Sequence, residues 1–317
     1  MCAPTTRQAL LIAESMLGRC PDHVSVFHPV VGGDDSYNFQ LRVHNVRTLL
    51  KIKRKPGSPV GIYFHDRIRK AGVPVPELVA FDPHAGPNGE TCVIWEWIEG
   101  QSAHWESGEP CPYNEAEFGE YLRHIHDLRF EGPFGLLGDD PPCTSHLYPD
   151  LGPTSESWME FFHFDRAAQR YFDKGYFDRR EADLIAMLPE RMAGVLNGVE
   201  PHLLHMGDIM HHGNMILNRD NGRILAVVDY VESMAGDPRW ELAWVDYYFS
   251  QYPFERMSFD MERFRFGYGA THETDDAVGR FYLVAILLFE KLLFFKPDSP
   301  RGRWAIEKVR NNLARTD

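Results

Sequence analysis

The hydrophobic pattern of the chain changes near residue 100, and this change limits the folds open to it. Before that point, apolar and polar side chains alternate in three short stretches, 24–31, 37–43 and 47–52. Residues typical of turns separate these stretches. Alternation of this kind is typical of half-buried strands. A short helix over about 62–71 and two more strands around a turn at 87–89 follow. The pattern predicts an antiparallel five-stranded sheet with one embedded helix.

Two further patterns complete the predicted architecture. Residues 5–18 fit an amphipathic helix with Thr at its start and Gly at its end. From about residue 114, apolar residues recur at helical spacing over 114–128, 156–175 and 181–195, while the Gly- and Pro-rich stretch 131–153 predicts a long loop. The second part is therefore mainly helical.

One hairpin interrupts the helical part. Two short apolar runs, Met215 to Leu217 and Ile224 to Val228, are joined by Asn218 to Gly222, which contains an Asn-Gly turn signal. We expect an α+β protein of two lobes, 1–100 and 101–317, with a hinge at 96–100. A cleft between two lobes is a usual place for a ligand.

Composition excludes several classes of protein. The 317 residues are 44% hydrophobic and 25% charged, as in an ordinary globular protein that can bury a sizeable core. The longest apolar run, Phe281 to Phe289, is far shorter than the roughly 20 residues that span a bilayer. The N-terminus has a helical rather than a signal-peptide pattern. We expect a cytoplasmic protein that does not enter a membrane.

The cysteines indicate neither disulfides nor a thiolate metal site. There are five of them, an odd number, and no two form a CxxC pair: Cys2, Cys20, Cys92, Cys111 and Cys143. We expect free thiols.

The charge is unevenly distributed. Residues 1–100 hold 11 Lys and Arg against 10 Asp and Glu, whereas residues 101–317 hold 22 against 36. Nucleic-acid binding depends on neutralising phosphates with Lys and Arg, so this balance disfavours it. A cationic small molecule would be attracted. Solubility alone is the other explanation.

Three oxygen-bearing side chains lie at one edge of the predicted hairpin. Asp208 and Asn214 precede its first strand, and Asp229 follows its second. Such ligands suit Mg²⁺, and phosphoryl transfer needs one aspartate for the attacking hydroxyl and an Asn and an Asp for the metal. The alternative is a set of polar turn residues capping a hairpin. The nearby histidines 202, 205, 211 and 212 could suggest zinc, but they lie on a strand and a turn instead of a helix face.

The sheet supplies groups for phosphates. The segment Gly32 to Ser36 is a Gly-containing turn, and Lys51 lies on the strand after it. Strand alternation places Lys53 on the same face, so Lys53 is a second candidate, and a solvated basic edge is the simpler explanation for both.

The motifs together resemble the aminoglycoside phosphotransferase family, small-molecule kinases with a protein-kinase-like fold. "HMGDIMHHGNMIL" resembles the catalytic loop H-G-D-x-x-x-x-N, and "AVVDYVESMAGDPRWELAW" resembles the metal-binding strand with the segment after it. "GVPVPELV", "CVIWEWIEG" and "LRHIHDL" resemble the strand after the embedded helix, the hinge and a later helix. The resemblance covers about 24–250, and "GDDSYNFQL" is closer to the hygromycin-kinase branch.

The resemblance implies a role for each matching residue. Asp208 is the catalytic aspartate, Asn214 and Asp229 hold Mg²⁺, and Lys51 pairs with the phosphates. Ser36 and Gly33 belong to the turn that covers the phosphates. The backbone of Glu96, Trp97 and Ile98 would meet adenine. Asp237 and Glu241, in "AGDPRWELA", would cap or brace the catalytic loop.

Two departures from the family pattern stand out. His205 is three residues before Asp208 and Asn214 six after it, whereas the family has two and five. The embedded helix also lacks the family glutamate that pairs with the strand lysine, and Asp66 is its only acidic residue.

The resemblance implies a phosphotransferase with an alcohol group as acceptor, which uses ATP, or GTP, with Mg²⁺. The acceptor would be a small, cationic molecule, first of all an aminoglycoside-type antibiotic, and the protein a resistance kinase. The alternatives are a kinase of choline, an amino alcohol or a sugar, and an inactive relative that binds nucleotide or ligand. We expect a monomer or homodimer.

Overall fold

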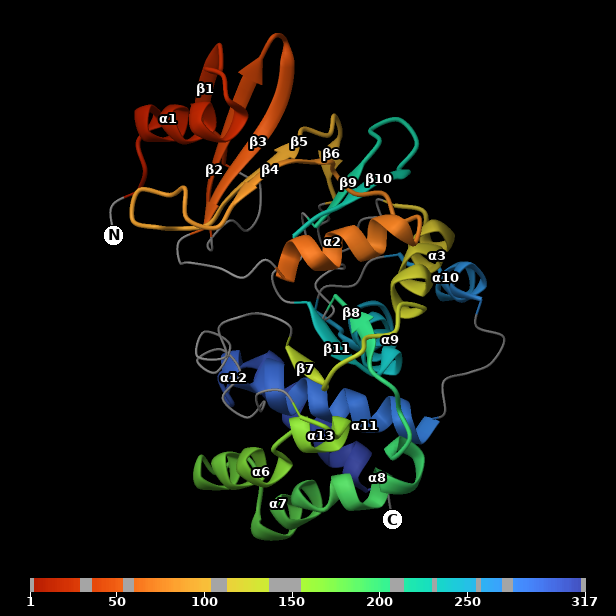
Figure 1. Ribbon diagram of the computed structural model, residues 1–317. Coiled ribbons are helices and arrows are strands. Elements are labelled where there is room, and N and C mark those ends of the chain that lie inside the picture. The colour runs from red at the N-terminus through yellow and green to blue at the C-terminus, as the bar shows by residue number, and fades with distance from the viewer. Residues whose placement is uncertain are drawn as a thin grey trace.

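The computed structural model describes residues 3–28, 36–53, 60–103, 113–136, 155–205, 214–229, 233–254, 258–269 and 276–314. The five strands of its N-terminal part gather at one end of the molecule and most of its helices at the other end (Figure 1). This is the two-lobed α+β arrangement that the change in periodicity predicts.

The N-terminal lobe is built on one antiparallel sheet. Its strands have the order β1-β2-β3-β5-β4. The bounds are β1 His23–Val26, β2 Ser36–Val43, β3 Val46–Lys53, β4 Leu78–Asp82 and β5 Cys92–Glu96. Helix α1, Thr6–Leu17, precedes them, with a capping box between Thr5 and Gln8 and a left-handed Gly18 after its last turn. The predicted strands and helix are confirmed.

The two faces of this sheet have different partners. One face packs its apolar side chains against α1 in a core that includes Ala9, Ile12, Phe39, Leu41, Leu50, Ile52 and Ile94. On strand β3 the alternate residues belong to the other face, and there Lys51 lies opposite Asn38 of β2 and Val93 of β5. Lys53 is on the same face as Lys51, as alternation predicts, and lies opposite Ser36.

Helix α2, Val60–Lys70, is covalently part of the sheet lobe but packs with the helical lobe. Its buried residues Phe64 and Ile68 belong to the same hydrophobic cluster as the later helices. On the sheet side, the ring of His65 lies 4.8 Å from the ring of Trp95 on β5. The helix therefore lies between the two lobes, as Figure 1 shows.

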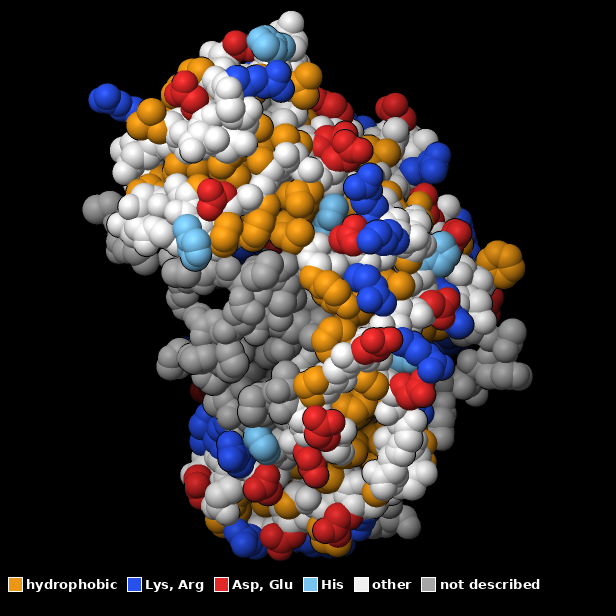
Figure 2. All heavy atoms as spheres, viewed as in Figure 1, with side chains coloured by type: hydrophobic (Ala, Val, Ile, Leu, Met, Phe, Trp, Pro, Cys, Tyr) orange, Lys and Arg blue, Asp and Glu red, His pale blue; other side chains and the backbone are white. Residues whose placement is uncertain are grey.

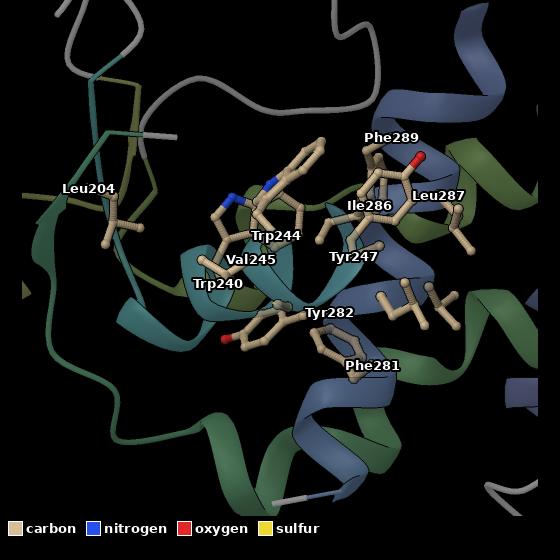
Figure 3. Close-up of a cluster of buried hydrophobic side chains, with 14 of the residues drawn as sticks. Leu204, Trp240, Trp244, Val245, Tyr247, Phe281, Tyr282, Ile286, Leu287 and Phe289 are labelled. Atoms are coloured by element: carbon tan, nitrogen blue, oxygen red, sulfur yellow. The ribbon is translucent and has the colours of Figure 1, made fainter. Parts of the chain in front are cut away.

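The helical lobe holds most of the buried apolar side chains. Its helices are α3 Glu115–His126, α5 Trp158–Phe161, α6 Phe164–Asp173, α7 Arg179–Ala186, α8 Leu188–Leu196, α9 Pro238–Asp246, α10 Met261–Tyr268, α11 Asp276–Ile286, α12 Leu292–Phe294 and α13 Pro300–Leu313. Two π-helical turns, η2 Tyr247–Gln251 and η3 Leu287–Lys291, extend α9 and α11. Figure 3 shows Trp240 of α9 and Tyr282 of α11 in the core between these helices.

Two predicted helices are each broken into two. Over 156–175 the backbone of Phe162 is extended between α5 and α6, and its ring packs 5.2 Å from that of Trp240. Over 181–195 the chain turns at Met187, and Pro189 lies in the first turn of α8, where its missing N–H costs nothing. Apolar spacing alone does not reveal either break, because the buried face continues across it.

Two small sheets lie in the helical lobe. The predicted hairpin is present as β9, Met215–Leu217, and β10, Ile224–Val227, and β6, Gln101–Ser102, pairs with β9. The other sheet has the order β7-β11-β8, with bounds Gly135–Leu136, Met234–Gly236 and His202–Leu204. The stretch 131–153 was predicted to be a loop, but it contains the short strand β7. Only helices were predicted after the hairpin, but β11 lies there. Both predictions were wrong at these strands.

The surface charges, the cysteines and the lengths of the helices complete the description of the fold. Lys, Arg, Asp and Glu are intermixed over the helical lobe on the face in view in Figure 2. Within the described ranges, Cys20 and Cys92 are free thiols, while Cys2, Cys111 and Cys143 lie outside them. No helix in those ranges has the length and apolar character needed to cross a membrane.

Candidate functional site

The two lobes meet at an ion pair between Lys51 and Asp229. Lys51 extends from β3 of the sheet, and Asp229 follows β10 of the hairpin; Nζ lies 3.6 Å from Oδ1. The Lys51 ammonium is the main influence that holds the pKa of Asp229 below its ordinary value, against the opposing effect of burial. Lys53 adds to this effect. The carboxylate is therefore ionised at neutral pH.

The backbone around Asp229 fixes its position. The N–H of Val227 donates to the carbonyl of Pro74, and the N–H of Val228 donates to the carbonyl of Asn214, both at 2.8 Å. Asp229 itself has a φ of 63°, a left-handed conformation that costs most residues energy but that Asp tolerates comparatively well. Asn214 thus lies beside the strand that presents Asp229, as the hairpin predicts.

The groups present fit a divalent cation. Oδ1 of Asp229 is buried and accepts no hydrogen bond from any described residue, and Lys51 at 3.6 Å is beyond direct hydrogen-bond length. The Asp229 side chain as a whole is 37% exposed. A carboxylate at the end of a strand whose neighbour begins beside Asn214 provides oxygen donors of the kind that Mg²⁺ takes when substrate phosphates supply further ligands.

The histidines of this region are structural where the structure describes them. His205 follows β8, is buried, and lies with its ring 5.7 Å from that of Phe64 on α2. Burial lowers the pKa of His205, so its imidazole is neutral at pH 7. His202 bonds through Nδ1 to the carbonyl of His126. Among the described residues there is no group of three His, Cys, Asp or Glu side chains that could hold a metal ion.

Asp237 and Glu241, which follow β11 in the chain, are both buried. Asp237 caps α9 by accepting from the N–H of Arg239, and its Oδ2 accepts a 2.5 Å hydrogen bond from Tyr282. Glu241 contacts His126 of α3 at 2.9 Å. The cap is that of α9, and the predicted bracing of the catalytic loop stays a prediction because residues 206–213 lie outside the described ranges. These contacts join the segment after β11 to α3 and α11.

The polar face of the sheet next to Lys51 contains a residue that the sequence reasoning missed. Asn38 is buried, lies opposite Lys51, and accepts a hydrogen bond from Ser36 Oγ at 3.3 Å. Ser36 is the first residue of β2 and is buried as well. The signal was available, because Ser36, Asn38 and Lys51 share a face by strand alternation.

The predicted hinge residues lie at the end of β5 and beyond it. The N–H of Glu96 already donates to the carbonyl of Glu77, and its side chain accepts from the N–H of Glu77. The ring of Trp97 packs 5.1 Å from that of Phe27, while Ile98 is half-buried.

Several predicted site residues lie outside the described residues. They are the catalytic candidate Asp208, Gly33 of the turn, and His211 and His212. Their roles, and the consequence of the longer spacing around Asp208, stay predictions.

The second departure from the family pattern is that the embedded helix lacks the glutamate that would pair with Lys51, and the contacts of α2 and Lys51 explain it. Asp66 on α2 pairs with Lys70 at 2.6 Å, and the partner of Lys51 is Asp229. The lysine is therefore neutralised from the hairpin.

Comparison with known proteins agrees with this arrangement. The model of the phosphotransferase enzyme family APH matches residues 27–277. None of the curated proteins compared with the chain matches it.

Among solved structures, a protein of Thermobifida fusca YX-ER1 provisionally assigned as a fructosamine-3-kinase is 17% identical. That match covers 96% of this chain and 98% of the other, with a TM-score of 0.63. A thermostable mutant of aminoglycoside phosphotransferase APH(4)-Ia, in a ternary complex with AMP-PNP and hygromycin B, is 17% identical over 98% of both chains, with a TM-score of 0.60. The fold is therefore the kinase-like fold of these enzymes, and the extent of the family match shows that the chain belongs to the APH phosphotransferase family of small-molecule kinases.

Proposed function

We propose that the protein transfers the γ-phosphoryl group of ATP, or of GTP, to a hydroxyl of a small cationic acceptor, with an aminoglycoside-type antibiotic as the first candidate. The observation that carries this proposal is the meeting of Lys51 and Asp229 across the lobes. A cation on the sheet and a carboxylate on the hairpin are the two charges that a metal-bound nucleotide needs at its phosphates.

We infer the roles of the residues from the family resemblance. Residues 1–100 hold the nucleotide, with the backbone after β5 at Trp97 and Ile98 facing the base and Glu96 contributing its carbonyl. Lys51 pairs with the phosphates, which the turn containing Gly33 and ending at Ser36 covers. This lobe provides the positive charge.

Residues 101–317 hold the acceptor and the metal ligands. Asp208 orients the acceptor hydroxyl and takes its proton, which is general base catalysis. Asn214 and Asp229 would hold Mg²⁺, which when bound neutralises charge on the transferred phosphoryl group.

Two observations support a cationic acceptor. The C-terminal part carries 36 acidic against 22 basic residues, which favours the approach of cations. The APH(4)-Ia structure, whose match covers 98% of the chain, contains hygromycin B. The fructosamine-kinase-like neighbour supports a second candidate, an amine-bearing sugar metabolite.

The test measures the release of ADP from ATP and of GDP from GTP, with Mg²⁺, in the presence of each candidate acceptor. The acceptors are hygromycin B, other aminoglycosides, peptide antibiotics, fructosamine, choline and sugars. Asp208→Asn is expected to reduce turnover by about 10²–10⁴-fold, the usual contribution of a general base. Asp220→Asn, an exposed residue in the turn of the same hairpin, is the matched control and should leave turnover unchanged.

The outcomes separate the alternatives. Release with one acceptor class that disappears in Asp208→Asn establishes the kinase and its substrate class. Stabilisation by Mg²⁺ nucleotide without release for any acceptor would instead favour an inactive binding relative, in which the longer loop around Asp208 has displaced the carboxylate.

A further inference from the structure

The ring of Trp97 reaches back over the sheet and touches a ring from its far edge. Trp97 follows β5 and Phe27 follows β1, and the two ring centroids lie 5.1 Å apart, edge to face. Two strands, β2 and β3, lie between β1 and β5 in the sheet. Neighbouring strands are about 4.8 Å apart, so the backbones of β1 and β5 are separated by roughly 14 Å. The two side chains can therefore meet only above the strands between them.

Strand β3 shows on which face of the sheet the rings meet. Arg47 alternates with Leu49 and Lys51 and shares their face, while Leu50 belongs to the core against α1 on the other face. The guanidinium of Arg47 lies over the Trp97 ring, 5.5 Å from its centroid. The Trp97 ring therefore covers part of the face that carries Lys51.

Two contacts fasten the Trp97 side chain in this place. The Phe27 ring holds it from β1, and the Arg47 guanidinium holds it from β3 while pairing with the carboxylate of Glu99. Arg47 is 38% exposed, and both rings are half-buried. Aromatic and cation–π contacts at partly exposed sites are individually weak. The ring is thus held in a preferred place that it can leave at a modest cost in free energy.

The nucleobase of the phosphoryl donor needs the same place. This step rests on the proposed function, which puts the phosphates at Lys51 and the base at the backbone of Trp97 and Ile98. Between these two points on the sheet lies Leu49, which is half-buried, comes two residues before Lys51 and pairs with β5. The Trp97 ring covers this strip of the sheet, and a purine base cannot share it.

We propose that Trp97 is a gate for the nucleobase: Phe27 and Arg47 hold its ring over Leu49, and the base binds only when the ring leaves. Such a gate lowers the apparent affinity for nucleotide in proportion to the fraction of molecules in which the strip is open. A ligand that consists of phosphates alone does not need the strip, so the gate does not affect it. The inference adds regulation to the site that the proposed function describes.

Calorimetric titration with ADP and with GDP, both in excess Mg²⁺, tests the gate. Trp97→Ala removes the ring and keeps the backbone, and it is expected to bind the preferred nucleotide about threefold to tenfold more tightly than the wild type. Pyrophosphate with Mg²⁺ carries no base, and its affinity should be the same for both proteins. If the ring instead stacks on the base, its loss weakens nucleotide binding, because stacking on an aromatic side chain stabilises a bound base.

Arg47→Gln tests the fastening without changing the ring. It should strengthen nucleotide binding about twofold to fivefold, although it removes a positive charge that attracts phosphates. Arg42→Gln, at an exposed position opposite Arg47 on β2, is the matched control and should not strengthen binding. In a Trp97→Ala background, Arg47→Gln should bring no further gain, because Arg47 acts through the ring. Circular dichroism and the unfolding midpoint establish that each variant is folded.

The outcomes distinguish the gate from the proposed function. Nucleotide binding by the wild type, together with equal or weaker binding by folded Trp97→Ala, overturns the gate and leaves the kinase intact. An equal gain for pyrophosphate also overturns it, because the effect then does not concern the base. So does a gain from Arg47→Gln that persists in full without the Trp97 ring. No nucleotide binding by either the wild type or Trp97→Ala overturns both.

Discussion

His126 of α3 and Glu241 of α9 form a buried pair, with Nε2 of the imidazole 2.9 Å from the carboxylate oxygen Oε2. The other ring nitrogen lies 2.8 Å from the hydroxyl of Tyr268 on α10. Burial raises the pKa of Tyr268, so its hydroxyl stays protonated. Because a carboxylate only accepts, Nε2 donates to Glu241, and three helices are joined through one imidazole.

Removing Glu241 should therefore be costly. Glu241→Ala leaves a buried imidazole donor without its acceptor, and an unsatisfied buried donor costs about 1–3 kcal/mol. Denaturant unfolding measures this change. The control is Glu200→Ala, which breaks the exposed pair of Glu200 with Arg129 and should cost less than about 1 kcal/mol. Equal losses in the two variants would contradict the structural role of Glu241.

The crossing of α3 and α10 depends on two glycines. A Cβ on Gly267 would overlap the carbonyl oxygen of Ala116, and one on Gly119 would overlap that of Phe264. Gly267→Ala should lower the free energy of unfolding by about 1–3 kcal/mol, because the backbones must separate.

Gly194→Ala in α8 is the matched control. A Cβ there meets no atom within 4 Å, so alanine should stabilise the helix by up to about 1 kcal/mol. Thermal unfolding of the two variants should shift in opposite directions. A Gly267→Ala protein as stable as the wild type would show that the helices cross at a greater distance.

The sequence predicted elements where a local rule decides them. Thr5, Gln8 and Gly18 set the ends of α1, and the Asn-Gly turn sets the hairpin, because capping and turn chemistry act over a few residues. β7 and β11 have two and three residues, which is too few for an alternation of apolar and polar side chains to be visible. They pair with each other although more than 90 residues separate them in the sequence.

The sequence predicted which residues could belong to the site but not which of their side chains lie together. The sequence placed Lys51 on the strand face of Lys53, and it placed Asp229 at the end of the hairpin. It could not show that these two side chains meet, since that depends on how the lobes pack through α2. The same packing makes His65 a buried contact of Trp95 instead of a partner for Lys51.

The buried histidines make stability depend on pH. The folded pKa of His65 is lowered by burial from the ordinary value of 6.5. As the pH falls through that value, the unfolded chain binds a proton that the folded protein does not, so folding stability is lost below about pH 6.5 and retained above it. His205, whose pKa is also lowered, acts in the same direction.

His65→Gln should weaken this dependence. Comparing denaturant midpoints at pH 7.5 and 5.5 should give a smaller difference for the variant than for the wild type. His84→Gln, at an exposed position, is the control and should keep the wild-type difference. The explanation fails if His65→Gln and His84→Gln give the same pH dependence.

The ammonium of Lys291 on η3 is enclosed by aromatic rings from the end of α9 and from η2. Nζ lies 4.5 Å from the ring of Trp244, 5.1 Å from that of Tyr248 and 5.4 Å from that of Tyr247, and it donates to the Tyr248 hydroxyl at 3.1 Å. Trp244 and Tyr247 are buried, so water competes little for the charge. Contacts of this kind contribute about 0.5–2 kcal/mol when partly desolvated.

Lys291→Met should thus destabilise the protein by about that amount although it keeps the apolar stem, whereas Lys291→Arg should retain most of the stability because a guanidinium also binds ring faces. Lys174→Met is the control: Lys174 is exposed and lies 5.7 and 6.0 Å from the rings of Tyr171 and Tyr176, so its loss should be smaller. Denaturant unfolding of the three variants measures the order. If Lys291→Met is as stable as the wild type, the two π-helical turns are held together by apolar packing, and the charge of Lys291 contributes nothing.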